Sequence, residues 1–348
     1  MKWEHLRPLF KEALSQEQNL RVDKGRVYIR YMHWSPDEVL DKMLEPSALE
    51  EMFGDWVQER REELIESAKA ILNEFGLEDR FGKLKEVYAR GSVVPFIGAG
   101  LSVSSGYPGW TSFLKQHIRE TVIDPAEFHR ILNLGQYEEA AQKLADALGP
   151  AFNEGVENTF GRSRDIAGCV QMLPHVFDSG VITTNFDDVA KRCYEAEGKP
   201  FSEELSGEMS QELPKKLAEG KRILLKLHGT STSARSRILT SSEYDRHYGE
   251  GNDLQRAIEA ICTRTLLFIG CSLTIDRTLS AMKALVQAKG HDNIARHYAF
   301  LPVPNSNAEK IARRDALMEC NIYPIWYPAD THDESIEALL MALMEDGL

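Results

Sequence analysis

Four short segments of the chain combine glycine with polar side chains in patterns that suit nucleotide binding or acid–base chemistry. The first, residues 96–102, reads Phe-Ile-Gly-Ala-Gly-Leu-Ser. Its small residues leave room for a phosphate group, whose oxygens can accept hydrogen bonds from backbone amides. Its glycine spacing differs from the G-x-G-x-x-G pattern, so this segment is not the common dehydrogenase fingerprint. The alternative is a tight turn between a strand and a helix.

The second segment, residues 183–188, reads Thr-Thr-Asn-Phe-Asp-Asp, and the third, residues 226–230, reads Lys-Leu-His-Gly-Thr. The amide of Asn185 can donate and accept hydrogen bonds, so it can orient a ribose hydroxyl or a water molecule. His228 carries a side chain suited to general-base work near neutral pH. A helix cap formed by Asn185 or Asp187 and a purely structural histidine are the alternatives.

The fourth segment, residues 268–272, reads Phe-Ile-Gly-Cys-Ser and is followed by Asp276. A glycine turn that carries a hydroxyl side chain could hold a second phosphate or a ribose. A turn that caps a helix is the alternative.

Each of these segments ends or follows a short apolar run, and two more such runs lie further along the chain. The six runs are residues 92–97, 180–184, 222–227, 265–269, 297–303 and 322–327. Helical patterns alternate with them, at residues 110–121, 138–148 and 333–344. This alternation predicts an α/β fold with a Rossmann-like, doubly wound parallel sheet and helical insertions. The carboxyl ends of parallel strands form one edge, so the four segments are expected to meet there.

The sequence before the first of these strands has a different pattern. We predict a mainly helical segment over residues 1–88 and the sheet domain over residues 89–348. Residues 3–17 and 59–75 have helical periodicity, residues 26–34 alternate like a strand, and a helix is expected to begin near Pro36. Apolar side chains of this segment are candidates for a seam within the chain or between subunits: Trp3, Leu6, Phe10, Trp56, Leu64 and Leu72.

Composition excludes several classes of protein. The 348 residues carry a net charge of −13, which disfavours non-specific binding to nucleic acids and to anionic membranes. Five cysteines without a C-x-x-C spacing favour reduced thiols in a cytoplasmic protein over a disulfide framework or a zinc ribbon. No apolar run approaches the roughly 18 residues that a membrane span needs.

The four segments, in this order, resemble the motifs of the sirtuin superfamily, and the resemblance covers about residues 91–327. Residues 106–110, Gly-Tyr-Pro-Gly-Trp, also resemble the cofactor loop of bacterial sirtuin-like proteins of antiphage defence. The resemblance implies that Asn185 orients the nicotinamide ribose and a water, and that His228 accepts a proton. It implies that NAD is held by Gly98, Ala99, Gly100, Ser102, Trp110, Thr184, Asp187, Gly270, Ser272 and Asp276. Asp187 would hold the carboxamide or fix its loop.

The sequence departs from the deacetylase branch of this family in one place. Deacetylases carry a four-cysteine zinc module after the His-Gly motif, whereas only Cys262 and Cys271 lie between His228 and Ala299 here. The resemblance therefore implies a protein without this module, without a metal and without much of the acyl-lysine groove. A contact to the adenosine ribose would fall at residues 299–300 or at Asn305.

What the resemblance implies is an NAD⁺ glycohydrolase that releases nicotinamide and ADP-ribose and depletes NAD in a bacterial antiphage defence system. An NAD-dependent protein deacylase or ADP-ribosyltransferase and a non-catalytic sensor of NAD or ADP-ribose are the alternatives. Homo-oligomers are expected, with a HerA-like ATPase, a short Argonaute or a phage-sensing domain as partner. Direct binding to nucleic acid or to membranes is not expected.

Overall fold

The computed structural model describes residues 3–16, 21–22, 25–26, 46–248, 253–273 and 277–345. The chain divides into two compact units, Met1–Ser67 and Ala68–Leu348. The division falls earlier than the boundary expected near residue 88. Helix α4 (Glu78–Ala89) thus belongs to the second unit.

Contacts of α4 explain this assignment. The guanidinium of Arg80 donates to the carbonyl of Pro324 at 2.5 Å, and the hydroxyl of Tyr88 donates to the carbonyl of Val176 at 2.8 Å. Both acceptors belong to the second unit, so α4 is bonded to it at two points. A helical pattern in the sequence does not reveal such partners, which lie far away along the chain.

The first unit contains short elements and the beginning of a long helix. These are η1 (Glu4–Leu6), α1 (Arg7–Gln16), the antiparallel strands β1 (Arg21–Val22) and β2 (Gly25–Arg26), and part of α3 (Pro46–Phe75). The helices predicted at 3–17 and 59–75 are confirmed, although α3 begins earlier. Almost all of the strand predicted at 26–34 and the helix start near Pro36 lie outside the described residues.

Within this unit, α1 packs on α3 through one ion pair and an aromatic cluster. Arg7 contacts Glu50 at 2.5 Å, and the ring of Phe10 lies 5.4 Å from that of Phe53 and 5.7 Å from that of Trp56. Of the six apolar side chains proposed for a seam, the chain buries five and half-buries Trp56. The seam residues are therefore already covered within a single chain.

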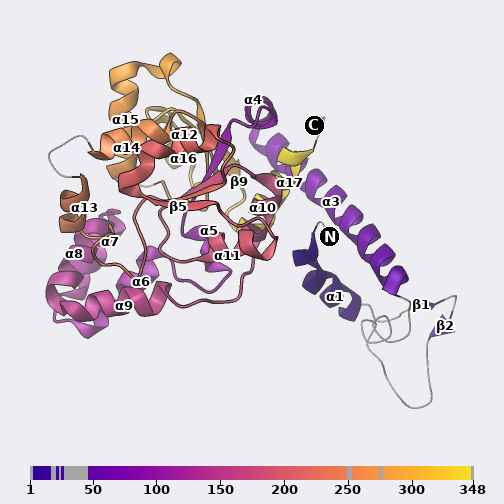
Figure 1. Ribbon diagram of the computed structural model, residues 1–348, viewed down its shortest axis with the longest axis horizontal. Coiled ribbons are helices and arrows are strands. Elements are labelled where there is room, and N and C mark those ends of the chain that lie inside the picture. Colours follow the sequence, from indigo (N-terminus) through magenta and orange to yellow (C-terminus); the bar gives the residue numbers. More distant parts are fainter. Residues whose placement is uncertain are drawn as a thin grey trace, which may run out of the picture. The chain divides into compact units, whose positions relative to one another are not determined.

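The second unit is built on a sheet of seven parallel strands (Figure 1). The strands are β3 (Val93–Ile97), β4 (Gly180–Thr183), β5 (Glu203–Ser206), β6 (Ile223–Lys226), β7 (Thr265–Ile269), β8 (His297–Pro302) and β9 (Ile322–Tyr327). Their order across the sheet is β5-β6-β4-β3-β7-β8-β9. The predicted fold class and all six predicted strands are confirmed. The sequence did not reveal β5, a short edge strand in which only Leu205 is buried.

Helices cover both faces of the sheet. They are α5 (Gly100–Val103), α6 (Trp110–His117), α7 (Pro125–Asn133), α8 (Tyr137–Leu148), α9 (Pro150–Phe160), α10 (Leu173–Val176), α11 (Val189–Ala196), α12 (Leu213–Ala218), α13 (Ser241–Tyr248), α14 (Asp253–Ile261), α15 (Arg277–Lys289), α16 (Asn307–Met318) and α17 (His332–Met344). Figure 1 shows α14, α15 and α16 on one side of the sheet and α10, α11 and α17 on the other. Because both faces are covered, the central strands β3, β4, β6 and β7 are buried at every position.

Strand order fixes the place of a binding site. The chain leaves β3 towards β4 and returns on the other side of β3 as β7. The connections after β3 and β7 therefore diverge, and a crevice opens at their carboxyl ends. Helices α6–α9, inserted between β3 and β4, pack against one another and against α13 beside this edge.

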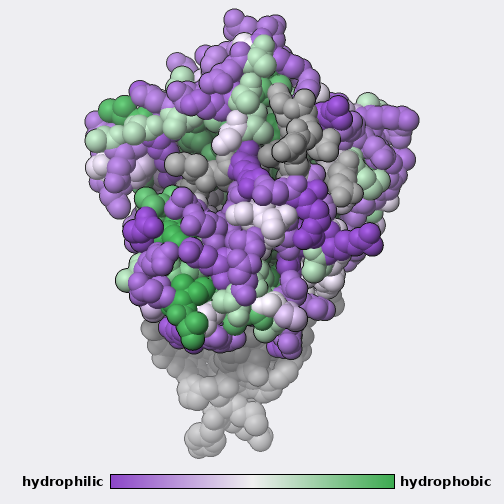
Figure 2. Space-filling model, turned by 90° about the vertical axis from the view of Figure 1, so that its left-hand side faces the viewer, coloured by the Kyte–Doolittle hydropathy of each residue, from purple (hydrophilic) through white to green (hydrophobic). Residues whose placement is uncertain are grey.

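The surface over α7, α8 and α13 is mainly hydrophilic, with scattered hydrophobic spots instead of one apolar patch (Figure 2). Val122 and Leu134 are among the few large apolar side chains exposed in the described parts of the chain. None of the helices that the structure describes is long and apolar enough to cross a bilayer.

A buried histidine at the amino end of β8 makes the fold sensitive to acid. His297 is fully buried, and its Nδ1 accepts a hydrogen bond from the amide of Leu266 at 3.1 Å. Burial lowers the pKa of His297 to about 3. The folded protein keeps this ring neutral, whereas the unfolded chain protonates it below about pH 6.5.

This difference predicts the pH dependence of stability. The neutral His297 contributes fully to the free energy of unfolding above about pH 6.5. This contribution decreases as the pH falls, by about 2 kcal/mol between pH 7.5 and 5.0. His297→Asn keeps an acceptor for Leu266 but removes the titration. In urea unfolding, the variant should lose about 2 kcal/mol less over this interval than the parent. Equal losses in both proteins would contradict a neutral buried imidazole.

Candidate functional site

A cavity of about 780 Å³ lies along the carboxyl edge of the sheet. Its lining comes from the ends of β3, β4, β6, β7, β8 and β9 and from α6, α8, α13, α15 and α16. The predicted site residues that line it are Gly98, Ala99, Gly100, Trp110, Thr184, His228, Gly270 and Ser272. Ser102, Asn185 and Asp187 are buried and are not among the lining residues. Asp276 lies outside the described residues.

The turns after β3 and β7 are interlocked. A Cβ on Gly98 would lie 2.6 Å from the carbonyl oxygen of Gly270, and one on Gly100 would lie 2.8 Å from the same atom. Gly270 itself has a φ of +66°, and a Cβ there would lie 2.7 Å from the amide of Leu101. These glycines are needed for packing between the two turns, in addition to the open approach for phosphate that the sequence predicts.

One amide of the glycine turn is available to a ligand. The amide of Gly100 donates to the carbonyl of Gly270 at 2.9 Å, and the amide of Leu101 donates to the carbonyl of Gly98 at 3.2 Å. The amide of Ala99, in contrast, has no acceptor in the described part of the chain. Because Ala99 also lines the cavity, its N–H can donate to a phosphate oxygen.

Asn185 joins the β3 and β4 ends. Its Nδ2 donates to the carbonyl of Gly98 at 3.0 Å and to the hydroxyl of Ser102 at 3.2 Å. Its own amide donates to the hydroxyl of Thr183 at 2.9 Å. Its Oδ1 is buried and has no partner among the described residues. The structure thus buries Asn185 directly beneath the glycine turn.

Asp187 belongs to the framework that holds this loop. Its carboxylate accepts from the amide of Val189 at 3.1 Å and from the hydroxyl of Ser102. Burial raises the pKa of Asp187, while the Val189 amide and the buried ammonium of Lys226 oppose the shift. That ammonium donates to the carbonyls of Phe186, at 3.1 Å, and of Asp187, at 2.6 Å. Lys226 thereby ties the loop after β4 to β6.

His228 is half-buried at the end of β6 and lines the cavity. Burial lowers its pKa to about 4, so the imidazole is neutral at pH 7 and able to accept a proton. Its Nε2 lies 3.1 Å from the hydroxyl of Tyr244 on α13. Gly229 has a φ of +76°, and a Cβ there would lie 2.2 Å from the carbonyl oxygen of Ser236. Only glycine lets the chain fold back at this point.

Helix α13, which brings Tyr244 to His228, is held by a buried ion pair. Arg237 contacts Glu243 at 2.8 Å and donates to the amide oxygen of Asn153 on α9 at 2.5 Å. The other carboxylate oxygen of Glu243 accepts from the backbone amides of Leu239 and Thr240. This cluster orders the loop between His228 and α13.

An aromatic contact fixes the inserted helices to the loop after β4. The ring of Trp110 lies 5.1 Å from that of Phe186, next to Asn185, in an edge-on arrangement. Phe160 on α9 lies 5.2 Å from Trp110 and 6.1 Å from Phe186. Trp110 therefore lines the cavity and also positions the loop after β4.

Several lining residues were not predicted from the sequence. Arg277 on α15 contacts Glu138 on α8 and Asp245 on α13, both at 2.8 Å. The others are Tyr244, Arg313, Tyr327 and His332. They lie on helices or at a strand end without a glycine motif, so no local pattern marks them. Only the fold brings them to the cavity.

A titration tests the environment of His228. We expect its imidazole resonance, assigned with a His228→Gln variant, to titrate with a pKa of about 4 in an NMR experiment. Its chemical shift should then stay constant from pH 5.5 to 8. A midpoint near 6.5, the ordinary value for histidine, would show that the ring is open to solvent and contradict the arrangement described above.

Comparisons with known proteins agree with this geometry. A profile of the SIR2-like domain family matches residues 179–325. The chain is 24% identical over 225 residues to NAD(+) hydrolase ThsA of Enterococcus faecium, which covers 63% of the chain and 45% of that protein. It is 23% identical over 218 residues to NAD(+) hydrolase ThsA of Bacillus cereus (strain MSX-D12), which covers 62% of the chain and 44% of that protein.

A third relative is Defense-associated sirtuin 2 of Bacillus subtilis, 26% identical over 198 residues, which covers 55% of the chain and 19% of that protein. The chain thus spans less than half the length of each of these relatives. The matched domain includes three of the four strand-end segments, and the glycine turn after β3 is packed against it. Residues 179–325 of the chain are therefore similar to the SIR2-like domain family.

Proposed function

We propose that this protein is an NAD⁺ glycohydrolase that cleaves the bond between nicotinamide and ribose. The observation that carries the proposal is the buried, unpartnered Oδ1 of Asn185 beside a cavity that His228 lines in its neutral form. An unpaired buried amide oxygen costs about 1–3 kcal/mol, and such groups in native proteins are often explained by function. The names of the hydrolase relatives support the same activity.

The residues present fit NAD. The Ala99 amide and the turns at Gly98–Gly100 and Gly270 leave space and a donor for a diphosphate. Asn185 Oδ1 can accept a hydrogen bond from a ribose hydroxyl or from the attacking water. Asp276 remains a proposed contact from the turn after β7. Asp187, Ser102 and Trp110 hold the loop that carries Asn185.

The proposed reaction is a hydrolysis. The C1′–N bond breaks, and its electron pair leaves with nicotinamide, while the ribose passes through an oxocarbenium-like state. Water then adds to C1′, and His228 takes its proton. The products are nicotinamide, ADP-ribose and one proton. The reaction as proposed uses water as the acceptor and needs no metal.

Substitution of the two central residues tests this proposal. Asn185→Ala and His228→Ala should each lower the rate of nicotinamide release by about 100-fold or more, the range of general-base catalysis. Because the Asn185 side chain is buried and donates two hydrogen bonds, the melting temperature of the Asn185→Ala variant must be measured as well.

His129→Ala on α7 and Asn158→Ala on α9 are matched controls, since both side chains are exposed and do not line the cavity. They should retain the parent rate. Adding an acetylated peptide to the assay separates hydrolysis from deacylation. Release of nicotinamide at the parent rate in a folded His228→Ala variant would refute the assignment.

We further infer that the enzyme acts in the cytoplasm as the NAD-depleting effector of an antiphage defence system. The name of the Bacillus subtilis relative supports the role in defence, and the five free cysteines suit a reducing compartment. A hydrolase that drains NAD must be restrained. We propose that the isolated subunit has low activity and that assembly into homo-oligomers raises it, with a HerA-like ATPase or another sensor as a candidate partner.

Light scattering tests the assembly. We expect a homo-oligomer whose nicotinamide release per subunit rises with protein concentration, because subunit contacts form only above the dissociation constant. Most of the seam residues are buried, so an exposed apolar side chain is the better position for a variant that tests assembly. Leu9→Ser changes such a side chain in the first unit. A monomer with the same activity at every concentration would rule out this form of control.

A further inference from the structure

The cavity lining contains side chains that the proposed cleavage does not use. The residues that the sequence suggested for the adenosine ribose are not among them: Ala299 and Phe300 are buried inside β8, Asn305 is exposed, and none of the three lines the cavity. The lining does include Tyr244 on α13 and Arg277 on α15. These two side chains contact each other, and the first of them also contacts the histidine that the proposed reaction uses as its base.

The contact with Tyr244 makes the two ring nitrogens of His228 different. Nε2 lies 3.1 Å from the hydroxyl oxygen of Tyr244, whereas Nδ1 has no hydrogen-bond partner in the described part of the chain. Because the ring lines the cavity, Nδ1 is the nitrogen that can take a proton from a bound water. A neutral imidazole carries one proton, so Nδ1 is a base only in the tautomer that is protonated at Nε2.

The hydroxyl of Tyr244 can select this tautomer. A tyrosine hydroxyl accepts as well as donates hydrogen bonds, so it can accept the N–H of Nε2. The same bond persists when Nδ1 takes a proton and the ring becomes charged, and a hydrogen bond with an ionised partner is stronger than a neutral one. Tyr244 is only 4% exposed, so little water competes for the contact. The hydroxyl therefore favours the proton-accepting form of His228 and then stabilises the charged product of the transfer.

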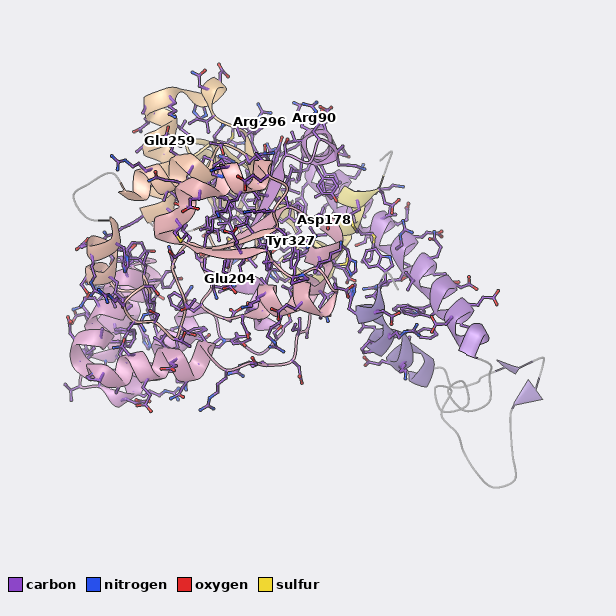
Figure 3. All side chains as sticks on the ribbon, viewed as in Figure 1. Arg90, Asp178, Glu204, Glu259, Arg296 and Tyr327 are labelled. Carbon is purple, nitrogen blue, oxygen red and sulfur yellow. The ribbon has the colours of Figure 1, made fainter. Side chains whose placement is uncertain are left out.

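Helices α8, α13 and α15 hold the Tyr244 ring in place. The guanidinium carbon of Arg277 lies 5.0 Å from the centre of this ring, and the same guanidinium contacts Glu138 on α8 and Asp245 on α13, both at 2.8 Å. In Figure 3, side chains fill the space between α13 and the neighbouring α8. Because its charge is paired with two carboxylates, Arg277 is better suited to hold the tyrosine than to capture an anion.

We propose that Tyr244 is a positioning residue for His228, whose Nε2–H it holds so that Nδ1 takes the proton in the reaction. Arg277 acts through Tyr244 by keeping the ring in place. The inference rests on the proposed function, because it takes His228 to be the base. The proton comes from the attacking water, moves to Nδ1 and is lost to solvent after the products form. Tyr244 stays neutral throughout.

Tyr244→Phe keeps the ring and removes the hydroxyl. In steady-state assays of nicotinamide release, kcat should fall by about tenfold or more, as expected for loss of a hydrogen bond to a charged group. The KM for NAD should stay at the parent value, because the bond is strengthened only during proton transfer. A lower melting temperature with an unchanged kcat would show a purely structural hydroxyl and overturn the proposal.

Tyr88→Phe is the matched control. The hydroxyl of Tyr88 on α4 donates to the carbonyl of Val176 at 2.8 Å, and the residue does not line the cavity. This variant also loses one hydrogen-bonded hydroxyl of the second unit, but it should retain the parent kcat. Equal losses of kcat in Tyr88→Phe and Tyr244→Phe would refute a specific role for Tyr244.

A double-mutant cycle tests the part that Arg277 plays. Arg277→Gln should lower kcat in the parent protein and have little further effect in the Tyr244→Phe variant, because the hydroxyl that it positions is already gone. Losses that multiply fully in the double variant would contradict action through Tyr244.

Nitrogen NMR spectroscopy tests the hydrogen bond without any turnover. At about pH 7, the His228 resonances, assigned with His228→Gln, should show a protonated Nε2 and an unprotonated Nδ1. Tyr244→Phe should convert this single tautomer into a mixture. A proton on Nδ1 in the parent protein would overturn the proposal.

The two proposals fail in different ways. If the spectrum shows the expected tautomer and its loss in Tyr244→Phe, but the protein releases no nicotinamide from NAD, the contact stands and the hydrolase proposal falls. If nicotinamide is released and Tyr244→Phe changes neither kcat nor the tautomer, the positioning role falls and the hydrolase proposal stands.

Discussion

The turns that follow β3 and β7 approach so closely that a Cβ at Gly98, Gly100 or Gly270 would lie 2.6, 2.8 or 2.7 Å from backbone atoms. This contact sets the spacing of the two strand ends between which the crevice opens. It also places the carbonyl of Gly98 3.0 Å from the side-chain nitrogen Nδ2 of Asn185. The open approach at the turn, the packing of the loops and the placement of the Asn185 side chain thus depend on the same three glycines, since any side chain there would force the turns apart.

Buried polar groups around this contact act as one network. Ser102 bonds to both Asn185 and Asp187, and Lys226 bonds to two carbonyls of the same loop. Each member is buried, so removal of one leaves its partners unsatisfied at a cost of about 1–3 kcal/mol. The network leaves Oδ1 of Asn185 unused. Rigid support around one free acceptor is what a site needs in order to orient a small hydroxyl group.

Much of the fold could be predicted because its strands are uniformly apolar and buried on both faces. Strand β5 escaped prediction because an edge strand such as Glu203–Ser206 carries polar residues. The strand-end motifs located the site, but they did not show that Asn185 is buried while Thr184 lines the cavity. Nor could they reveal Tyr244 or Arg313. Tyr244 contacts His228, 16 positions away in the sequence, and Arg313 contacts Ser272, 41 positions away. Side-chain direction and long-range pairing depend on packing that no local pattern encodes.

The central claim is that the free oxygen of Asn185 and the ring of His228 face the nicotinamide ribose of bound NAD. A crystal structure of the His228→Ala variant with NAD measures this directly, because the substrate should remain intact. The account predicts a ribose hydroxyl, or a water beside C1′, within hydrogen-bond distance of Asn185 Oδ1. NAD bound elsewhere, or Oδ1 bonded to another protein group with the ribose out of reach, would contradict it.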